Sequence, residues 1–262
     1  MDWDDAYANS IHIPGGDGFP ARWTAAAAAF RATAKGHLDQ RYGTAGREVY
    51  DLFLPEGEPR GTVIFIHGGY WLAFDKSSWS HLAAGPLAHG WAVALPSYTL
   101  APQARIGEMV RQIGQAVSTI ADANPGEIRL AGHSAGGHLA TRMSCIGSPF
   151  SGRIAKTLSI SGLHDLRPLL RTAMRTELRL DEAQATAESP ALLAPREGTV
   201  ATCWAGANER PEFIRQTALL ANIWTGLGAT TKQVIAPGRH HFDVIDELAS
   251  PDSPMVAELL AS

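Results

Sequence analysis

The sequence predicts an α/β protein whose mostly parallel, twisted sheet is covered by helices on both faces. Short apolar runs rich in β-branched residues, typical of strands buried on both faces, alternate along the chain with longer segments of helical periodicity. Strands and helices that alternate in this way build parallel sheets. The chain has 262 residues and shows no repeat or composition break, so we expect one domain over residues 1–262.

The sequence of the first part of the chain predicts helices followed by an edge hairpin. Residues 1–45 lack a strand pattern, and residues 23–34 are rich in alanine, the strongest helix former. We expect this helical segment to lie across the core or the functional site. Residues 47–54 alternate apolar and polar positions and end at Pro55, which predicts a strand of an edge hairpin.

The rest of the chain alternates between apolar runs that predict strands and segments of helical periodicity. Predicted strands cover residues 62–67, 91–95, 127–131, 155–161, 199–204 and 230–236. Predicted helices cover residues 77–89, 106–123, the stretch after Ser134, residues 211–227 and the C-terminus. Residues 163–196 form a charged, partly helical insertion, which we expect to act as a small cap.

Composition excludes several classes of function. Charged residues make up 18% of the chain and the net charge is −4, which offers no basic surface for nucleic acid. No apolar run reaches the ~18 residues that a membrane span needs, and the first residues are acidic rather than signal-like. The two cysteines show no metal-ligand spacing. We therefore expect a cytoplasmic protein that acts on a small molecule without metal, cofactor, membrane or nucleic acid; the sequence is compatible with a homodimer and does not determine the oligomeric state.

The segment Gly132-His-Ser-Ala-Gly136 has the G-x-S-x-G pattern of a nucleophile elbow. A serine hydroxyl must stand clear of its neighbours for a base and a carbonyl carbon to reach it, and a tight turn between a strand and a helix achieves this. The strained turn requires small residues two positions before and after Ser134, and both are glycine. The sequence therefore predicts Ser134 as the nucleophile of a serine hydrolase.

A serine nucleophile needs a histidine base and a carboxylate, and hydrolases with such an elbow place both after the serine in the chain. We expect His241 to be the base because it follows the last strand and precedes an apolar helix start; its neighbour His240 is the alternative. Glu209 follows the penultimate strand and is the expected acid. Asp165 is its competitor, although a helix-capping role suits it better, and Glu212 fits a role at the helix dipole.

Glycines directly after a buried strand predict an oxyanion hole, because they let backbone N–H groups approach the substrate. We assign the N–H groups of Gly69 and Ala135 as donors with Gly68 assisting, and His67 as a brace of this loop. The neighbouring side chains are expected to form the substrate pocket. They are Tyr70, Trp71 and His133.

The chain resembles the α/β-hydrolase superfamily over almost its full length. The motif His67-Gly-Gly-Tyr-Trp71 is similar to the H-G-G-x-W form of the kynurenine formamidases rather than the H-G-G-G form of hormone-sensitive-lipase-like esterases. Further motifs that resemble this group are Tyr98-Thr-Leu-Ala-Pro102, Gly132-His-Ser-Ala-Gly-Gly137 and His241-Phe242. The resemblance places the acid just before Pro211-Glu-Phe213, where Glu209, followed by Arg210, stands in place of the aspartate of many eukaryotic members.

The resemblance implies the α/β-hydrolase fold and a cofactor-free serine hydrolase that cleaves a small amide or ester through an acyl-enzyme. We expect an arylformamidase that acts on N-formylkynurenine or a similar formanilide. The alternative is a carboxylesterase or arylesterase for short-chain acyl esters, because bacterial proteins with these motifs are also described in that way. A more remote alternative is a non-catalytic binding protein on the same fold, which would have no need of Ser134, Glu209 and His241 together.

Overall fold

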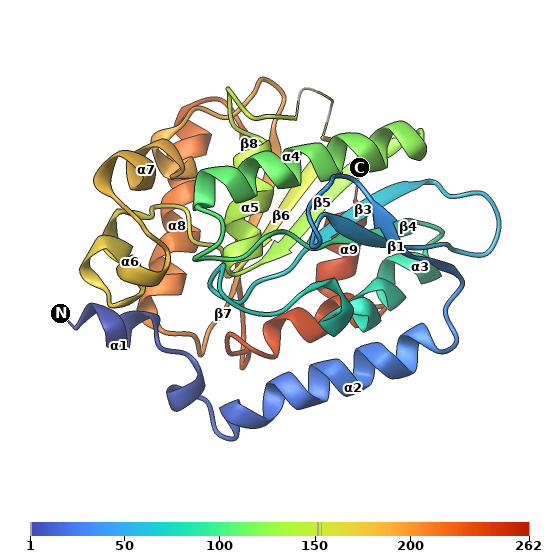
Figure 1. Cartoon of the computed structure of the whole chain (residues 1–262), viewed down its shortest axis with the longest axis horizontal. Helices are drawn as coiled ribbons and strands as arrows, with labels where there is room; N and C mark the ends of the chain where they lie inside the picture. Colours follow the sequence, from blue (N-terminus) through green and yellow to red (C-terminus); the bar gives the residue numbers. More distant parts are fainter. Residues whose placement is uncertain (1, 151, 153, 262) are drawn as a thin grey trace.

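The computed structural model describes residues 2–150, 152 and 154–261, and contains an eight-stranded sheet (Figure 1). The strands follow the order β1-β2-β4-β3-β5-β6-β7-β8 across the sheet. Their bounds are β1 Gly36–Arg41, β2 Val49–Phe53, β3 Gly61–Ile66, β4 Ala92–Pro96, β5 Glu127–His133, β6 Lys156–Ile160, β7 Val200–Gly206 and β8 Thr230–Ala236. The pairs of β2 with β1 and with β4 are antiparallel, and the other five pairs are parallel. The predicted mostly parallel sheet is therefore confirmed.

Helices cover both faces of the sheet, because consecutive residues of the central strands are buried in different apolar clusters. Ile64 and Ile66 of β3 belong to the cluster that α4 and α5 cover, whereas Val63 and Phe65 belong to the cluster that contains residues of α2 and α9 (Figure 1). The α-helices are α1 Trp3–Tyr7, α2 Phe19–Arg31, α3 Ala84–Ala88, α4 Ile106–Ala123, α5 Ala135–Met143, α6 Met174–Glu177, α7 Glu182–Ala187, α8 Pro211–Gly226 and α9 Pro254–Leu260. Short 3₁₀ helices lie at Ser10–His12, Gly16–Gly18, Lys76–Ser78, Ser80–Ala83, Arg167–Arg171, Pro190–Leu192 and Val244–Ala249.

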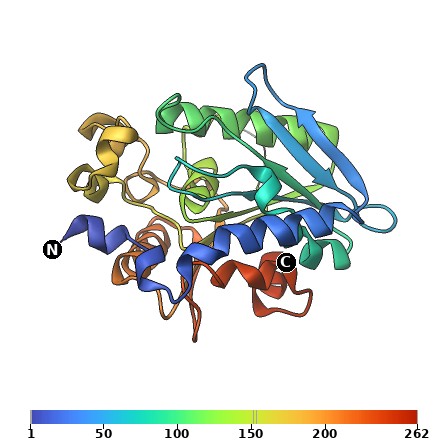
Figure 2. The same ribbon diagram turned by 60° about the horizontal axis from the view of Figure 1, so that its bottom comes forward.

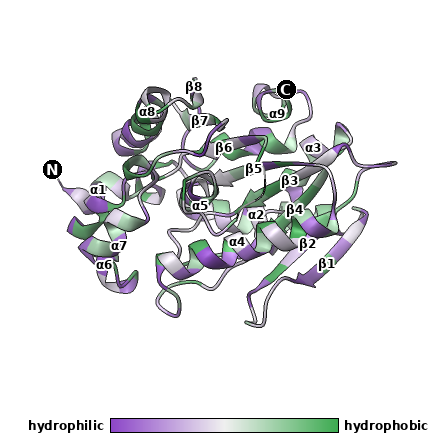
Figure 3. Cartoon of the chain, turned by 90° about the horizontal axis from the view of Figure 1, so that it is seen from above, coloured by the Kyte–Doolittle hydropathy of each residue, from purple (hydrophilic) through white to green (hydrophobic). Residues whose placement is uncertain are grey.

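Strand β1 corrects the prediction that residues 1–45 are helical. All six of its residues are exposed and its sequence carries no apolar alternation, so the hydrophilic edge of the sheet in Figure 3 has no strand signal of its own. Its backbone pairs with β2, and the edge hairpin is therefore β1–β2. Strand β2 does not pair with β3, which follows it in the chain, but pairs with β4 on its other side.

The N-terminal residues run along the outside of the molecule before the sheet begins (Figure 2). Helix α1 lies beside the insertion of residues 163–196, where the Asp4 carboxylate accepts a hydrogen bond from the backbone N–H of Ala173 at 2.7 Å. Helix α2 then packs beside the 3₁₀ helices of residues 76–83, with Trp23 and Ala27 buried. Among the helices of the described residues, none combines the length and the apolar character that a membrane span requires.

The segments that carry the predicted site residues follow the carboxyl ends of the parallel strands and lie at the same edge of the sheet. Strand β3 ends before the glycines at 68 and 69, β5 ends at His133, and β7 ends just before Glu209. Strand β8 ends at Ala236, before the histidines at 240 and 241. Since parallel sheets bind ligands outside the carboxyl ends of their strands, this edge is the place for a functional site.

Candidate active site

Ser134 lies at the turn between β5 and α5 in a backbone conformation that few residues adopt. Its φ is 55° and its ψ is −119°, as the elbow pattern predicts. A Cβ at Gly132 would lie 2.2 Å from the carbonyl oxygen of Gly136, and a Cβ at Gly136 would lie 2.0 Å from that of Ile66. Only glycine fits at both positions. The turn sets Ser134 at the N-terminus of α5, where the helix dipole favours negative charge.

His241 and Glu209 form a buried pair. The Nδ1 atom of His241 lies 2.7 Å from Oε2 of Glu209, and their side chains are 2% and 0% exposed. The other carboxylate oxygen, Oε1, accepts hydrogen bonds from the backbone N–H of Gly206 at 2.7 Å and from the hydroxyl of Ser161 at 2.5 Å. A carboxylate with three partners is held in one orientation. It can therefore hold the imidazole of His241 in the tautomer that leaves Nε2 free to accept a proton.

Ser161 was not predicted as a site residue, although its hydroxyl donates a hydrogen bond to Glu209. It directly follows β6, has a φ of 52°, and donates its backbone N–H to the carbonyl oxygen of Trp204 at 2.6 Å. A non-glycine residue in the left-handed region costs about 1–3 kcal/mol and persists where its surroundings require it. Its position at the carboxyl end of a strand beside β7 is the one signal that could have identified it.

The histidines that directly precede the predicted nucleophile and the predicted base, His133 and His240, have other partners. His133 Nε2 lies 2.9 Å from the carbonyl oxygen of His241, so this ring nitrogen donates, and burial followed by the nearby His241 places the pKa of His133 well below its usual value. His133 is therefore a neutral side chain that fixes the backbone of His241. The Nδ1 atom of His240 accepts from the backbone N–H groups of Phe242 and Asp243 at 3.2 and 3.3 Å. The structure thus brings His241 to Glu209 and engages His240 in its own loop.

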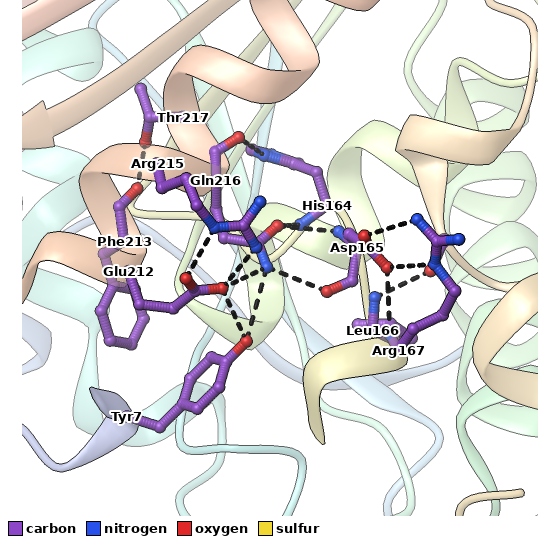
Figure 4. Close-up of polar contacts among 11 residues, drawn as sticks. Tyr7, His164, Asp165, Leu166, Arg167, Glu212, Phe213, Arg215, Gln216 and Thr217 are labelled. Atoms are coloured by element: carbon purple, nitrogen blue, oxygen red, sulfur yellow. Dashed lines mark hydrogen bonds and ion pairs between the residues drawn. The ribbon is translucent and has the colours of Figure 1, made fainter. Parts of the chain in front are cut away.

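The two rejected carboxylates belong to a separate polar network (Figure 4). Asp165 forms an ion pair with the side chain of Arg167 at 2.8 Å. Its carboxylate also accepts a hydrogen bond at 3.1 Å from the backbone N–H of Arg167, the first residue of a 3₁₀ helix, in agreement with the capping role that its sequence context suggests. Glu212 does more than face the helix dipole of α8. It binds Arg215 at 2.7 Å and accepts hydrogen bonds from the hydroxyl of Tyr7 and the side-chain amide of Gln216, both at 2.9 Å.

The loop after β3 presents the glycines of the predicted oxyanion hole. Within the described part of the chain, no hydrogen bond uses the backbone N–H of Gly68, Gly69 or Ala135. A Cβ at Gly68 would lie 3.0 Å from that of Ser134, so the loop approaches the serine closely. Gly69 has a φ of 104°, which favours glycine. His67 is buried, stacks on Tyr98 at 4.5 Å, and places its Nδ1 2.8 Å from the carbonyl oxygen of Gly68.

The two residues after these glycines have unusual backbone angles. Tyr70 and Trp71 have φ angles of 54° and 60°, so three consecutive residues occupy the left-handed region. For the two non-glycine residues this conformation costs about 1–3 kcal/mol each. Backbone hydrogen bonds close the turn, among them those from Leu72 and Ala73 to the carbonyl oxygen of Gly69 at 2.9 and 3.0 Å.

The prediction that Trp71 lines the substrate pocket is wrong. Its side chain is fully buried in the cluster beneath α4 and α5, where its ring meets His138 edge-on at 5.3 Å. The positive φ turns the chain at this point, and the indole enters the core instead of the cavity. The sequence could not indicate this, because a tryptophan after a glycine loop suits either environment.

We expect Trp71→Ala to lower the free energy of unfolding by about 3–5 kcal/mol, because it leaves a large cavity in the core. The ratio of rates on acetyl and butyryl esters should stay unchanged. Trp71→Phe, which keeps an aromatic ring in the core, serves as the matched control with a smaller loss. Denaturant unfolding and acyl-chain profiles measure both effects. If Trp71→Ala protein has the stability of the wild type but a shifted preference for acyl-chain length, Trp71 lines the pocket and the core assignment is contradicted.

A cavity of about 300 Å³ lies over Ser134 and His241. Its wall also contains Gly69, Tyr70 and His133. Four of the nine remaining lining residues are aromatic, and each of the four contacts at least one of the others. They are Trp23, Phe74, Trp79 and Phe242, with centroid separations of 4.7 Å for Trp23–Trp79, 5.3 Å for Trp23–Phe242 and 5.5 Å for Phe74–Trp79.

The cover of this cavity comes from the N-terminal part of the chain. Ser10, Gly16, Asp17 and Pro20 line the cavity together with Trp23 of α2, so the N-terminal segment lies across the site, one of the two positions expected for it. No described residue of the insertion 163–196 lines it, contrary to the expected cap. The described residues contain no group of three or more His, Cys, Asp or Glu side chains arranged to hold a metal ion.

Comparisons with known proteins show the family to which the chain belongs. Residues 63–216 match the family model described as alpha/beta hydrolase fold. The chain is 31% identical over 246 residues to the kynurenine formamidase of Salmo salar and 30% identical over 235 residues to that of Drosophila melanogaster. These matches cover 88% and 81% of the chain, and 83% and 77% of those relatives.

Solved structures of high similarity include hydrolases of other kinds. A crystal structure from Silicibacter sp. TM1040, provisionally described as a thioesterase, has a TM-score of 0.95 and 48% identity, and both chains are covered completely. A hyperthermophilic esterase from Pyrobaculum calidifontis has a TM-score of 0.72 at 17% identity, with 94% of this chain and 93% of that chain covered. The second likeness concerns the fold alone.

Proposed function

We propose that the chain, which belongs to the family of the alpha/beta hydrolase fold and is a hydrolase, uses Ser134, His241 and Glu209 as a catalytic triad on a small aryl amide. One observation carries this proposal. A serine on a strained elbow and a histidine bound to a buried carboxylate line the same cavity. A binding protein of the same fold would not require this combination, so the non-catalytic alternative is the weaker one.

The proposed reaction proceeds in two halves. Ser134 Oγ attacks the carbonyl carbon while its proton passes to His241 Nε2, and the N–H groups of Gly69 and Ala135, with Gly68 assisting, stabilise the oxyanion that forms. The C–N bond then breaks as His241 returns the proton to the leaving amine. Water attacks the acyl-enzyme by the reverse sequence and releases the carboxylic acid. Glu209 holds His241 in the required tautomer throughout.

The substrate class follows from the wall of the cavity. Aromatic side chains surround a volume near the lower end of the usual range for ligand pockets, about 300–1,000 Å³, which suits a flat ring with a small acyl group. Aromatic contacts add about 0.5–1.5 kcal/mol each beyond burial. N-formylkynurenine combines a ring with a formyl group, and relatives at about 30% identity are kynurenine formamidases. The proposed activity is therefore that of an arylformamidase.

An ester or thioester substrate is the second candidate. It is favoured by the structure with 48% identity that is provisionally described as a thioesterase, and the same triad would cleave a C–O or C–S bond. Ester and thioester leaving groups need less protonation than an amine, so a triad able to cleave the amide also cleaves these bonds. The discriminating quantity is thus a ratio of rates on matched substrates.

The experiment compares kcat/KM for N-formylkynurenine, p-nitrophenyl acetate and S-phenyl thioacetate in one buffer. We expect the highest value for N-formylkynurenine, at least about tenfold above the others, which corresponds to 1.4 kcal/mol. Ser134→Ala protein serves as the control for background hydrolysis. A higher value on the ester or thioester would assign the chain to the second candidate, and turnover that survives Ser134→Ala would contradict the proposed triad.

A further inference from the structure

The segment Asp5–Asn9 contacts the chain on both sides of the candidate active site. Tyr70, next to Gly69 in the oxyanion loop, donates its hydroxyl to the carbonyl oxygen of Tyr7 at 2.6 Å. The same hydroxyl oxygen accepts a hydrogen bond from the side-chain amide of Asn9 at 2.7 Å. Burial raises the pKa of Tyr70, so its phenol stays protonated and able to donate.

The same segment also binds the loop that carries the acid. Arg210, directly after Glu209, forms an ion pair with the carboxylate of Asp5 and donates from Nε to the backbone oxygen of Asp5 at 3.2 Å. Two residues further along the chain, the buried carboxylate of Glu212 accepts from the hydroxyl of Tyr7 (Figure 4). Tyr7 thus binds the oxyanion loop through its backbone and the start of α8 through its side chain.

We propose that residues Asp5–Asn9 are a clamp that sets the position of the oxyanion loop relative to the acid loop, with Tyr70 as its positioning residue. The inference rests on the proposed triad and oxyanion hole. The left-handed backbone at Gly69, Tyr70 and Trp71 needs support from its surroundings, and the loop has two anchors: the indole of Trp71 in the core and the hydroxyl of Tyr70 in the clamp. Loss of the second anchor lets the N–H of Gly69 move away from the position where the oxyanion forms.

The primary test is Tyr70→Phe, which removes both hydrogen bonds and keeps the ring. We expect kcat on p-nitrophenyl acetate to fall by about 10- to 100-fold, less than the ~10²–10³-fold loss when a donor of an oxyanion hole is deleted. KM should change by less than about twofold, because the substrate is bound equally well before the charge forms. Affinity for a boronic acid that mimics the tetrahedral state should fall by the same factor as kcat.

Asp4→Ala is the matched control. Asp4 docks the N-terminal segment onto the insertion through the N–H of Ala173, and no hydrogen bond or ion pair in the described structure joins its side chain to either catalytic loop. It should leave kcat and boronic acid affinity unchanged. If Asp4→Ala loses as much activity as Tyr70→Phe, general loosening explains the effect and the clamp is wrong. Unchanged kcat in Tyr70→Phe, or a loss confined to KM, would overturn it as well.

Asn9→Ala keeps the experiment decisive if Tyr70→Phe does not fold. It removes one of the two hydrogen bonds of the Tyr70 hydroxyl, so we expect a smaller loss of kcat in the same direction, again without a change in KM. An unchanged kcat would contradict the clamp. Failure of the proposed function is recognised separately, since wild-type protein would then show no Ser134-dependent turnover of p-nitrophenyl acetate.

Discussion

Replacement of Ser134 by alanine is expected to lower kcat by about 10⁶-fold, the loss that follows removal of the nucleophile in other serine triads. The reason is geometric, because the turn between β5 and α5 places Ser134 in the wall of the same cavity that His241 lines. The fold should persist, since alanine removes only the hydroxyl. Steady-state rates on the preferred substrate and thermal melting of the purified variant measure both expectations.

Ser161→Ala is the matched control for this experiment. It also removes one buried serine hydroxyl near the site, but this hydroxyl binds Glu209. A hydrogen bond to a charged group contributes about 1.5–3 kcal/mol, so a loss of about 10- to 100-fold is expected. More than a few per cent of wild-type activity in purified Ser134→Ala protein would remove Ser134 from the nucleophile position.

Glu209→Gln is expected to lower kcat by about 10³- to 10⁴-fold with little change in the fold. The amide of glutamine can donate to Nδ1 of His241, which favours the tautomer with the proton on Nε2, and this tautomer cannot accept the proton of Ser134. The side chain keeps its size and its contacts with Gly206 and Ser161. Single-turnover kinetics with p-nitrophenyl acetate isolate the acylation step in which the loss should appear.

Asp165→Asn separates the two candidate acids. Asp165 binds Arg167. Burial raises the pKa of Asp165, but the hydrogen bonds from the side chain and the backbone N–H of Arg167 together lower it below its usual value. We expect Asp165→Asn to reduce stability modestly and to leave the rate at working temperature nearly unchanged. Large loss of activity in Asp165→Asn together with an active Glu209→Gln protein would transfer the role of the acid to Asp165.

The sequence was sufficient for features whose cause is local. Gly132 and Gly136 are required by backbone contacts within a few residues or with the adjacent strand, so the pattern itself predicts the turn. Apolar runs in the sequence predict the buried strands. The carboxyl ends of these strands lie at one edge of the sheet, which limits where His241 and Glu209 can lie. The distance of 2.7 Å between Nδ1 of His241 and Oε2 of Glu209 follows from that topology.

Features that depend on distant partners were not predictable. Strand β1 is mostly polar and all six of its residues are exposed, and it forms because β2 offers backbone hydrogen bonds. Ser161 gains its role from Glu209, which lies 48 positions further along the chain. The direction of Trp71 depends on a positive φ that no residue type dictates, and the contact of Tyr70 with Tyr7 joins segments 63 positions apart.

The central claim is that Ser134 is made nucleophilic by the pair of His241 and Glu209. Labelling with an alkyl fluorophosphonate, followed by intact-mass measurement and peptide mapping, tests it most directly. One adduct per chain on the peptide that contains Ser134 is expected, with no adduct in Ser134→Ala protein and labelling about 10³- to 10⁴-fold slower in Glu209→Gln protein. An adduct on another residue, or equal labelling rates in wild-type and Glu209→Gln protein, would contradict the claim.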